Sequence, residues 1–157
     1  MKRPEPTARI AARHAHPRVL AVDYGRRRLG LAVSDALGLT AKPLGTLERR
    51  NRREDVRRLR TLVREHEVGQ IVVGCPLHLD GRESDMAVEA ARFARRLEKE
   101  LGVLVELADE RLTSWEAAQI SAEHQGRKRR RRTHDELAAA ILLRDYLEQQ
   151  RARQQGI

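Results

Sequence analysis

The sequence predicts an α/β fold: a mixed five-stranded sheet that opens with an antiparallel hairpin and carries helices on both faces. One observation is the stretch 19–35, VLAVDYGRRRLGLAVSD, in which two apolar runs flank a short basic turn. Another is that short apolar runs then alternate with segments of helical spacing. Such alternation predicts βαβ crossovers onto one sheet. The antiparallel part of the sheet should therefore be the opening hairpin.

The hairpin contains the first candidate functional residue. Val19 to Val22 form a continuous apolar run, which is typical of a strand buried on both faces. Asp23 follows at the inner end of that strand, where a charge is costly unless another group compensates it. Gly30 in the second apolar run indicates close approach of another segment or a ligand. A plainer alternative stays open, because aspartate often starts a turn by bonding the backbone two residues on.

Past the hairpin, the chain alternates strands and helices. Ala41 to Leu47 predicts a third strand, and Pro43 and Gly45 favour an edge position for it. Apolar residues at helical spacing predict a helix from Glu54 to His66, ended by Gly69. The later elements are a short buried strand at 71–73, a helix at 86–101 capped by Gly102, and a strand at 103–107.

Two capping boxes mark the starts of the last two helices. Thr113 with Glu116 predicts one start, and Thr133 with Glu136 predicts the other. Between them, residues 124–132 are charged and lack apolar side chains, so we expect a mobile basic loop there. The last helix should bury the stripe Leu137, Ile141, Leu142 and Tyr146.

Length and composition indicate one domain with an aliphatic core. The chain has 157 residues, of which aromatics are 3%. We expect a flexible basic arm at 1–17, one domain at 18–150 and a polar tail at 151–157 that frays beyond Gln149. The longest apolar run, 137–143, is too short to span a bilayer, so a cytoplasmic protein without a membrane partner is the default. Cys75, the single cysteine, excludes an internal disulfide.

The net charge of +9 is concentrated in two segments. Residues 1–18 carry +4 and residues 127–132, RKRRRR, carry +6, so the remaining 133 residues sum to about −1. Basic segments around a near-neutral body suit a polyanionic partner. Arginine outnumbers lysine 28 to 4, which nucleotide composition alone can produce, so scattered arginines carry less weight than the six-residue run.

Three acids occupy comparable places in the predicted fold. Asp23 and Glu110 end strands, and Asp135 lies in the first turn of the last helix. Ligands gather at the carboxyl ends of strands in open α/β sheets, so the first two should converge there, and the third can join if the last helix crosses that end. Singly, each has a plainer role as a turn former, an exposed strand end or a favourable charge at a helix start.

Convergence of these acids would favour a metal ion. Two carboxylates about 4 Å apart repel by ~4 kcal/mol at an effective dielectric constant of 20. Mg²⁺ or Mn²⁺ relieves the repulsion, because hard divalent ions take carboxylate oxygens as ligands. Two such ions can activate a water and stabilise the leaving oxygen of a phosphodiester.

Four segments carry a resemblance to a known family: DYGRRRLGLAVSD, IVVGCPLHLDG, DERLTSWEAA and HDELAAAILLRDYL. Over about residues 18–148 the chain resembles the YqgF family, also called RuvX or Holliday-junction-resolvase-like. The resemblance implies an RNase H-like nuclease domain that matures the 5′ end of pre-16S rRNA. It also implies Asp23, Glu110 and Asp135 as the metal-binding catalytic acids. Cys75, His78 and His134 depart from the family pattern, and we expect His134 to alter the pH response of the neighbouring acid.

Candidate nucleic-acid contacts are basic and lie near the acids or in the basic run. The hairpin turn could bind a phosphate backbone, although for any single residue a solvated turn is the simpler explanation. Arg111 could neutralise the scissile phosphate or pair with a neighbouring acid. The full set is Arg26, Arg27, Arg28, Arg111, Arg127, Lys128, Arg129, Arg130, Arg131 and Arg132.

Three classes of function remain open from the sequence. A nuclease could process structured RNA, including pre-ribosomal particles, or resolve branched DNA. Symmetric resolution of a four-way junction requires a homodimer, whereas a monomer would favour RNA. A noncatalytic assembly factor would need the basic segments but not the acids. An ATP-binding domain of the actin and hexokinase type would need a second domain, for which this chain has no room.

Overall fold

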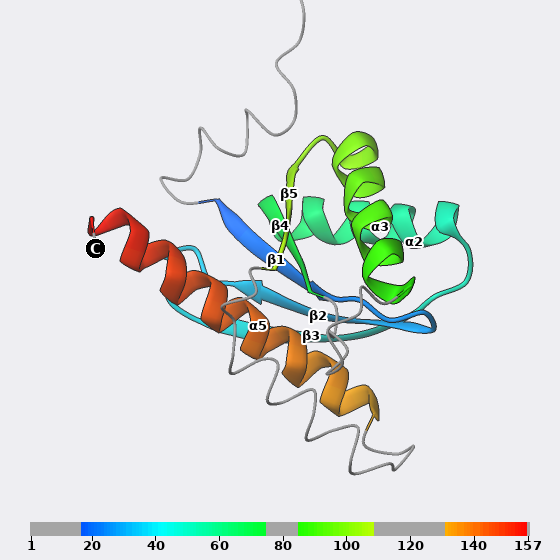
Figure 1. Cartoon of the computed structure of the whole chain (residues 1–157), viewed down its shortest axis with the longest axis horizontal. Helices are drawn as coiled ribbons and strands as arrows, with labels where there is room; N and C mark the ends of the chain where they lie inside the picture. Colours follow the sequence, from blue (N-terminus) through cyan, green and yellow to red (C-terminus); the bar gives the residue numbers. More distant parts are fainter. Residues whose placement is uncertain (1–16, 75–84, 109–130, 157) are drawn as a thin grey trace, which may run out of the picture.

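The computed structural model describes residues 17–74, 85–108 and 131–156, with side chains of the last segment described from 135 onward (Figure 1). It confirms the predicted mixed five-stranded sheet, whose strand order is β3-β2-β1-β4-β5. Neighbouring strands are antiparallel across β3, β2 and β1, and parallel across β1, β4 and β5. The strands are β1 (Arg18–Asp23), β2 (Arg28–Ser34), β3 (Ala41–Glu48), β4 (Val68–Gly74) and β5 (Leu104–Leu107).

Helices cover both faces of the sheet, as predicted (Figure 1). α2 (Arg52–Glu65) and α3 (Asp85–Leu101) pack on one face, and α5 (Arg131–Gln154) packs on the other. Alternation along β1 divides the core: Leu20 and Val22 belong to the cluster under α2 and α3, whereas Val19 and Ala21 belong to the cluster under α5. The sheet is therefore buried on both faces around β1.

At one end of the sheet, three strands end, the antiparallel hairpin turns, and the three described helices begin. β1, β4 and β5 run parallel and end at Asp23, Gly74 and Leu107, and we call this the carboxyl end of the sheet. β2 begins and β3 ends there, because they are antiparallel in turn. α2, α3 and α5 each begin at this end and run back along the sheet, so their positive dipole ends lie at this end.

The prediction that Gly69 ends the helix expected from Glu54 to His66 was wrong. α2 ends at Glu65, and β4 begins at Val68, so the glycine lies inside a strand. A Cβ at Gly69 would approach the Cβ of Pro17 to 2.3 Å. The residue with a left-handed backbone is Glu67, with φ 51°. Close packing, rather than helix termination, explains the glycine.

α5 differs from its prediction at both ends, whereas its expected buried stripe is confirmed at Leu142 and Tyr146 but not at Leu137. It begins at Arg131, so Thr133 lies inside the helix, and it continues to Gln154 past the expected fraying point. Leu137 was expected to be buried but is 49% exposed, whereas Ala138 and Ala139 are fully buried. Among the described helices, none is long and apolar enough to cross a bilayer.

Candidate active site

Asp23 is buried at the carboxyl end of β1, where two neighbouring strands fix its position. It is 7% exposed, and its Cα pairs with Gly30 of β2 and with Gly74 of β4. Strand alternation directs its side chain to the face that α5 covers, because Ala21 packs in that core. The next residue, Tyr24, extends the pairing with β4, since its N–H donates to the Gly74 carbonyl at 2.7 Å. Asp23 is thus held by backbone ladders on both sides.

Gly30 brings Asp135 against the strand that pairs with Asp23. A Cβ added to Gly30 would lie 2.0 Å from the carbonyl oxygen of Asp135 and 3.1 Å from its Cβ. Only glycine permits this approach of α5. The helix begins at Arg131, so Asp135 lies in its second turn and not in the first turn that the sequence predicted. Gly30 is also the Cα partner of Asp23 on the neighbouring strand. Asp23 and Asp135 are therefore both next to this glycine, one in the sheet and the other in the helix above it. The sequence-based expectation of close approach at Gly30 is confirmed, and the approaching segment is α5.

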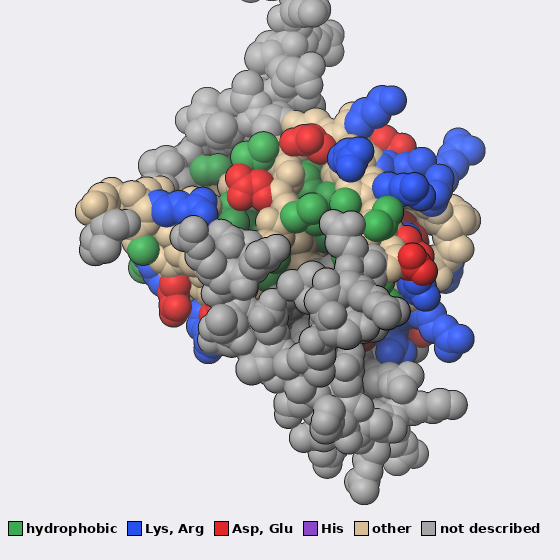
Figure 2. All heavy atoms as spheres, in the orientation of Figure 1, with side chains coloured by type: hydrophobic (Ala, Val, Ile, Leu, Met, Phe, Trp, Pro, Cys, Tyr) green, Lys and Arg blue, Asp and Glu red, His purple; other side chains and the backbone are tan. Residues whose placement is uncertain are grey.

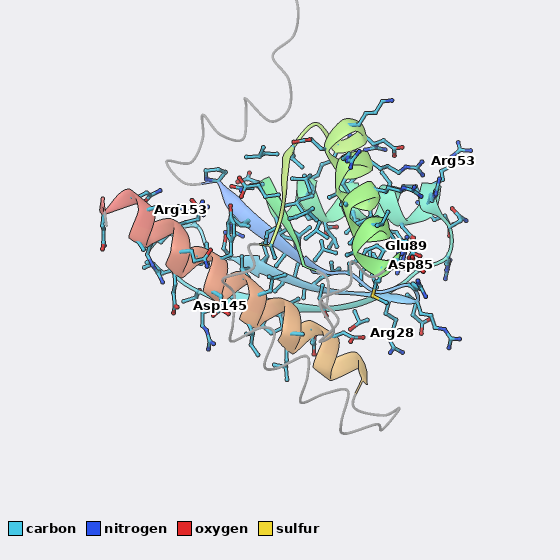
Figure 3. The ribbon with its side chains drawn as sticks, in the orientation of Figure 1. Arg28, Arg53, Asp85, Glu89, Asp145 and Arg153 are labelled. Carbon is cyan, nitrogen blue, oxygen red and sulfur yellow. The ribbon has the colours of Figure 1, made fainter. Side chains whose placement is uncertain are left out.

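Two arginines of the hairpin turn form ion pairs with acids on different helices (Figure 3). Arg28 Nε donates to Asp135 Oδ2 at 3.1 Å, and their side chains are 27% and 23% exposed. Arg26 Nε and Nη2 reach the two carboxylate oxygens of Glu89 in α3, both at 3.2 Å. The hydrogen bond to Glu89 raises the pKa of Arg26 above its usual value. The turn therefore joins the starts of α3 and α5.

Several predicted site residues lie outside the described part of the chain. Glu110 and Arg111 are among them. So is most of the basic run: Arg127, Lys128, Arg129 and Arg130. Arg131 and Arg132 belong to α5, but their side chains are also outside it. Within the described ranges, no three His, Cys, Asp or Glu side chains gather as a metal-holding group.

Arg49, which the sequence did not single out, anchors the turn that follows Asp23. Its Nη1 donates to the Tyr24 hydroxyl at 3.0 Å and to the Gly25 carbonyl at 3.2 Å. Its Nε pairs at 3.1 Å with Asp55, whose side chain is 1% exposed. The guanidinium also lies 5.0 Å and 5.3 Å from the ring centroids of Tyr24 and Phe93. One side chain thus joins the β3–α2 connection, the hairpin turn, α2 and α3.

A cavity of about 330 Å³ lies at the opposite end of the sheet from Asp23. Its walls include Pro17, Gln70 and Tyr146. Gln70 donates to the Tyr146 hydroxyl, which in turn donates to Glu106 at 3.0 Å. Burial, together with Glu106, raises the pKa of Tyr146, so the hydroxyl stays protonated. These polar groups satisfy one another, and we assign them a structural role.

Comparison with known proteins shows the family to which this chain belongs. A family model described as "RuvX: Holliday junction resolvase" matches residues 17–149. The chain belongs to the RuvX family. Relatives include two proteins named "Putative pre-16S rRNA nuclease". The one from Koribacter versatilis (strain Ellin345) is 46% identical over 134 residues, which are 85% of this chain and 88% of that protein. The one from Syntrophus aciditrophicus (strain SB) is 46% identical over 132 residues, covering 83% and 88%.

A solved structure shows the fold of the RuvX domain independently. T. thermophilus RuvC in complex with Holliday junction substrate matches with a TM-score of 0.53 at 19% identity, covering 86% of this chain and 96% of that chain. The likeness confirms the RNase H-like fold that the sequence resemblance implied.

Proposed function

We propose that this chain is a divalent-metal-dependent nuclease that hydrolyses phosphodiester bonds in structured nucleic acid. The single observation that carries the proposal is the approach of Asp135 to Gly30, the ladder partner of Asp23. This contact brings two of the three candidate acids, 112 positions apart in the sequence, to one end of the sheet. The match to the RuvX family over residues 17–149 supports nuclease chemistry.

The third acid in the proposed site is Glu110. Ala108, two residues earlier, donates its N–H to the Val73 carbonyl at 2.8 Å, one residue before the end of β4. Two residues of chain span at most about 7 Å, so Glu110 is within reach of the carboxyl end. Three carboxylates without a nitrogen or sulfur donor suit Mg²⁺ or Mn²⁺. When bound to Asp23, Glu110 and Asp135, such ions would supply an activated water and stabilise a leaving oxygen.

The residues around this site would position the substrate and balance its charge. Asp23 sits on a strand held on both sides, so its backbone position and the face on which its side chain lies are fixed. Arg28 holds the Asp135 carboxylate at 3.1 Å and carries a charge opposite to that of a phosphodiester. The positive ends of three helices point toward the same region. A polyanionic substrate is therefore favoured here despite the buried acid.

The substrate that we propose is precursor 16S rRNA, at its 5′ end. The names of the relatives at 46% identity favour RNA over branched DNA. We place the reaction in the cytoplasm, on free precursor RNA or on pre-ribosomal particles, with the protein as a monomer. Resolution of four-way DNA junctions is the second candidate, favoured by the description of the family model, and it requires a homodimer. A noncatalytic assembly factor is disfavoured, because a pure polyanion binder gains nothing from clustered acids.

The test compares the wild-type protein with Asp23→Asn on a precursor 16S rRNA fragment and on a four-way DNA junction, each with Mg²⁺ and with Mn²⁺. We expect Asp23→Asn to abolish cleavage and leave binding largely intact, since the change removes a charge but little volume. Asp85→Asn is the matched control, because Asp85 is an exposed acid at the same end of the sheet. Retained turnover in Asp23→Asn would exclude Asp23 as a catalytic acid.

A further inference from the structure

The exposed side of α2 carries four arginines on one helical stripe. They stand at intervals of four, three and four residues, which places them along one side of the helix. The buried residues of α2, including Val56, Leu59 and Val63, lie on a neighbouring side. We call the set the arginine stripe: Arg53, Arg57, Arg60 and Arg64.

Because of the arginine stripe, α2 has the largest excess of basic over acidic side chains among the described helices. α2 contains six arginines and three acids, whereas α3 contains four basic and four acidic side chains. One of the three acids, Asp55, is buried and paired with Arg49, which lies outside the helix. Within the described residues, no acid lies within ion-pair distance of a stripe guanidinium. Arg60 donates to a neutral group, the Glu100 carbonyl, at 3.2 Å.

This arrangement does not stabilise the helix. Like charges three and four residues apart repel on a helix surface. Arg53 lies in the first turn, where the helix dipole favours negative charge, and only Arg64, in the last turn, is favoured by the dipole. Figure 2 shows Lys and Arg side chains gathered over the part of this face formed by α2 and α3. A helix face that only contacts water is more stable with both positive and negative side chains, as α3 has. The arginine stripe has only positive charges, so it suits binding of an external anion.

The start of the stripe lies at the same end of the sheet as the candidate active site, on the face opposite to the one that α5 covers. Arg49 and Asn51 precede α2, and Arg49 is bound to Tyr24 and Gly25, the two residues after Asp23. Arg53 projects from the start of α2, at the end of the molecule where Arg28 also lies (Figure 3). From there the stripe runs back for about 16 Å, at 1.5 Å per residue. That length matches roughly five nucleotides of a helical strand at 3.4 Å each.

We propose that the arginine stripe binds the phosphate backbone of the nucleic acid on one side of the cleaved bond. The inference rests on the proposed function for its choice of partner. Regular spacing along a helix, uncompensated charge and continuity with the Asp23 turn together fit an extended polyanion rather than a single small anion. Guanidinium groups bind phosphate oxygens at such a surface without reading the bases.

The test removes three charges from the stripe and compares the result with three removed elsewhere. The stripe variant is Arg53→Gln/Arg57→Gln/Arg64→Gln, which spares the bond from Arg60 to Glu100. The control is Lys42→Gln/Arg151→Gln/Arg153→Gln, at the opposite end of the sheet. Both carry Asp23→Asn, so that binding is measured without cleavage. Fluorescence anisotropy with an RNA hairpin is recorded from low to high salt.

We expect the stripe variant to bind up to about a hundredfold more weakly at 0.1 M salt, with the slope of log K against log salt reduced by roughly 2 to 3. The control should change the slope by less than 1. Equal slopes in the two variants would overturn the proposal.

Two further measurements keep the outcome interpretable. Circular dichroism and the melting temperature show whether α2 remains folded, and the triple Arg→Lys variant should restore the slope because it restores the charge. Failure of Arg→Lys to restore the slope would also overturn the proposal. Because binding is measured without turnover, a wild-type protein that cleaves nothing would contradict the proposed function while leaving this test intact.

Discussion

Replacing Gly30 with alanine is expected to damage the candidate site through the backbone of α5. The added Cβ would lie 2.0 Å from the carbonyl oxygen of Asp135 and 2.5 Å from its carbonyl carbon. Real Cβ contacts are essentially never shorter than 3.0 Å, so the backbone of α5 at Asp135 would have to move by about 1 Å. The obstacle is backbone rather than a flexible side chain, so rotation of a torsion angle cannot relieve it.

The expected size of the effect follows from that displacement. Overpacking of a closely packed contact costs about 1–3 kcal/mol of unfolding free energy. A misplacement of about 1 Å at a catalytic group can lower turnover by about 10²-fold. We therefore expect Gly30→Ala to lower both stability in urea and the rate of metal-dependent cleavage, with the rate falling more than the folded fraction explains.

Gly69→Ala is the matched control for this prediction. Its added Cβ would lie 2.3 Å from the Cβ of Pro17, a similar clash within a strand but at the opposite end of the sheet. It should lower stability to a similar degree while leaving cleavage per folded molecule near the wild-type value. A Gly30→Ala protein with wild-type stability and turnover would refute the contact between Gly30 and α5. The stability measurement in urea tests this contact whichever nucleic acid is the substrate.

Two further predictions concern ion pairs near the site. Arg49→Met should cost about 3–5 kcal/mol, because it leaves the buried Asp55 without its cation. Arg49→Met/Asp55→Asn should recover much of that loss in urea unfolding. Arg28→Gln should lower, by about tenfold, the Mg²⁺ or Mn²⁺ concentration that gives half of the metal-induced rise in melting temperature. The reason is that Arg28 holds the Asp135 carboxylate at 3.1 Å, and its positive charge repels a divalent ion nearby by ~1 kcal/mol or more.

Each of these predictions has an outcome that contradicts it. If the single and double variants at Arg49 and Asp55 are equally destabilised, the two side chains are not coupled. For the metal titration, Arg28→Lys serves as the control, because it keeps the charge while changing the shape. An unchanged midpoint in Arg28→Gln would mean that the ion binds away from Asp135.

The sheet was predictable because its strongest elements have unambiguous patterns. The run Val19 to Val22 is continuous and apolar, and the structure buries it from both sides. Gly30 was correctly interpreted as a point of close approach. Gly69 was misinterpreted, because a glycine can end a helix or allow tight packing in a strand, and one letter does not distinguish the two. Only the contact with Pro17, made by tertiary structure, decides it.

The buried face of α5 illustrates a different limit. Periodicity favours large apolar residues such as Leu137 as the contact face, yet this leucine is 49% exposed. The contact between Asp135 and Gly30 fixes the rotation of the helix, and close packing then requires small side chains such as Ala138 and Ala139 against the sheet. A preference for size correctly predicted that Leu142 and Tyr146 are buried, but it did not anticipate that alanines fill the first buried positions of α5.

The cluster around Arg49 was missed for a third reason, which is that its members share no periodicity. Tyr24 belongs to the hairpin, Asp55 to α2 and Phe93 to α3, and each looks ordinary in its own segment. Only the folded chain shows that one guanidinium contacts all three. The sequence could nominate the candidate acids because strand ends and helix starts have local patterns, whereas a residue that joins several elements has none.

The placement of the acids on regular elements has a consequence for how the site can vary. Asp23 is positioned by two backbone ladders, and Asp135 by contact of a helix backbone with a glycine. Neither position depends on the conformation of a long loop, so the distance between them is set by strand register and by the size of residue 30. A one-residue shift of β2 against β1 would move the glycine to the other face and replace it with a leucine beside Asp23. The hairpin register and Gly30 therefore must be retained together if the two acids are to act on one phosphodiester.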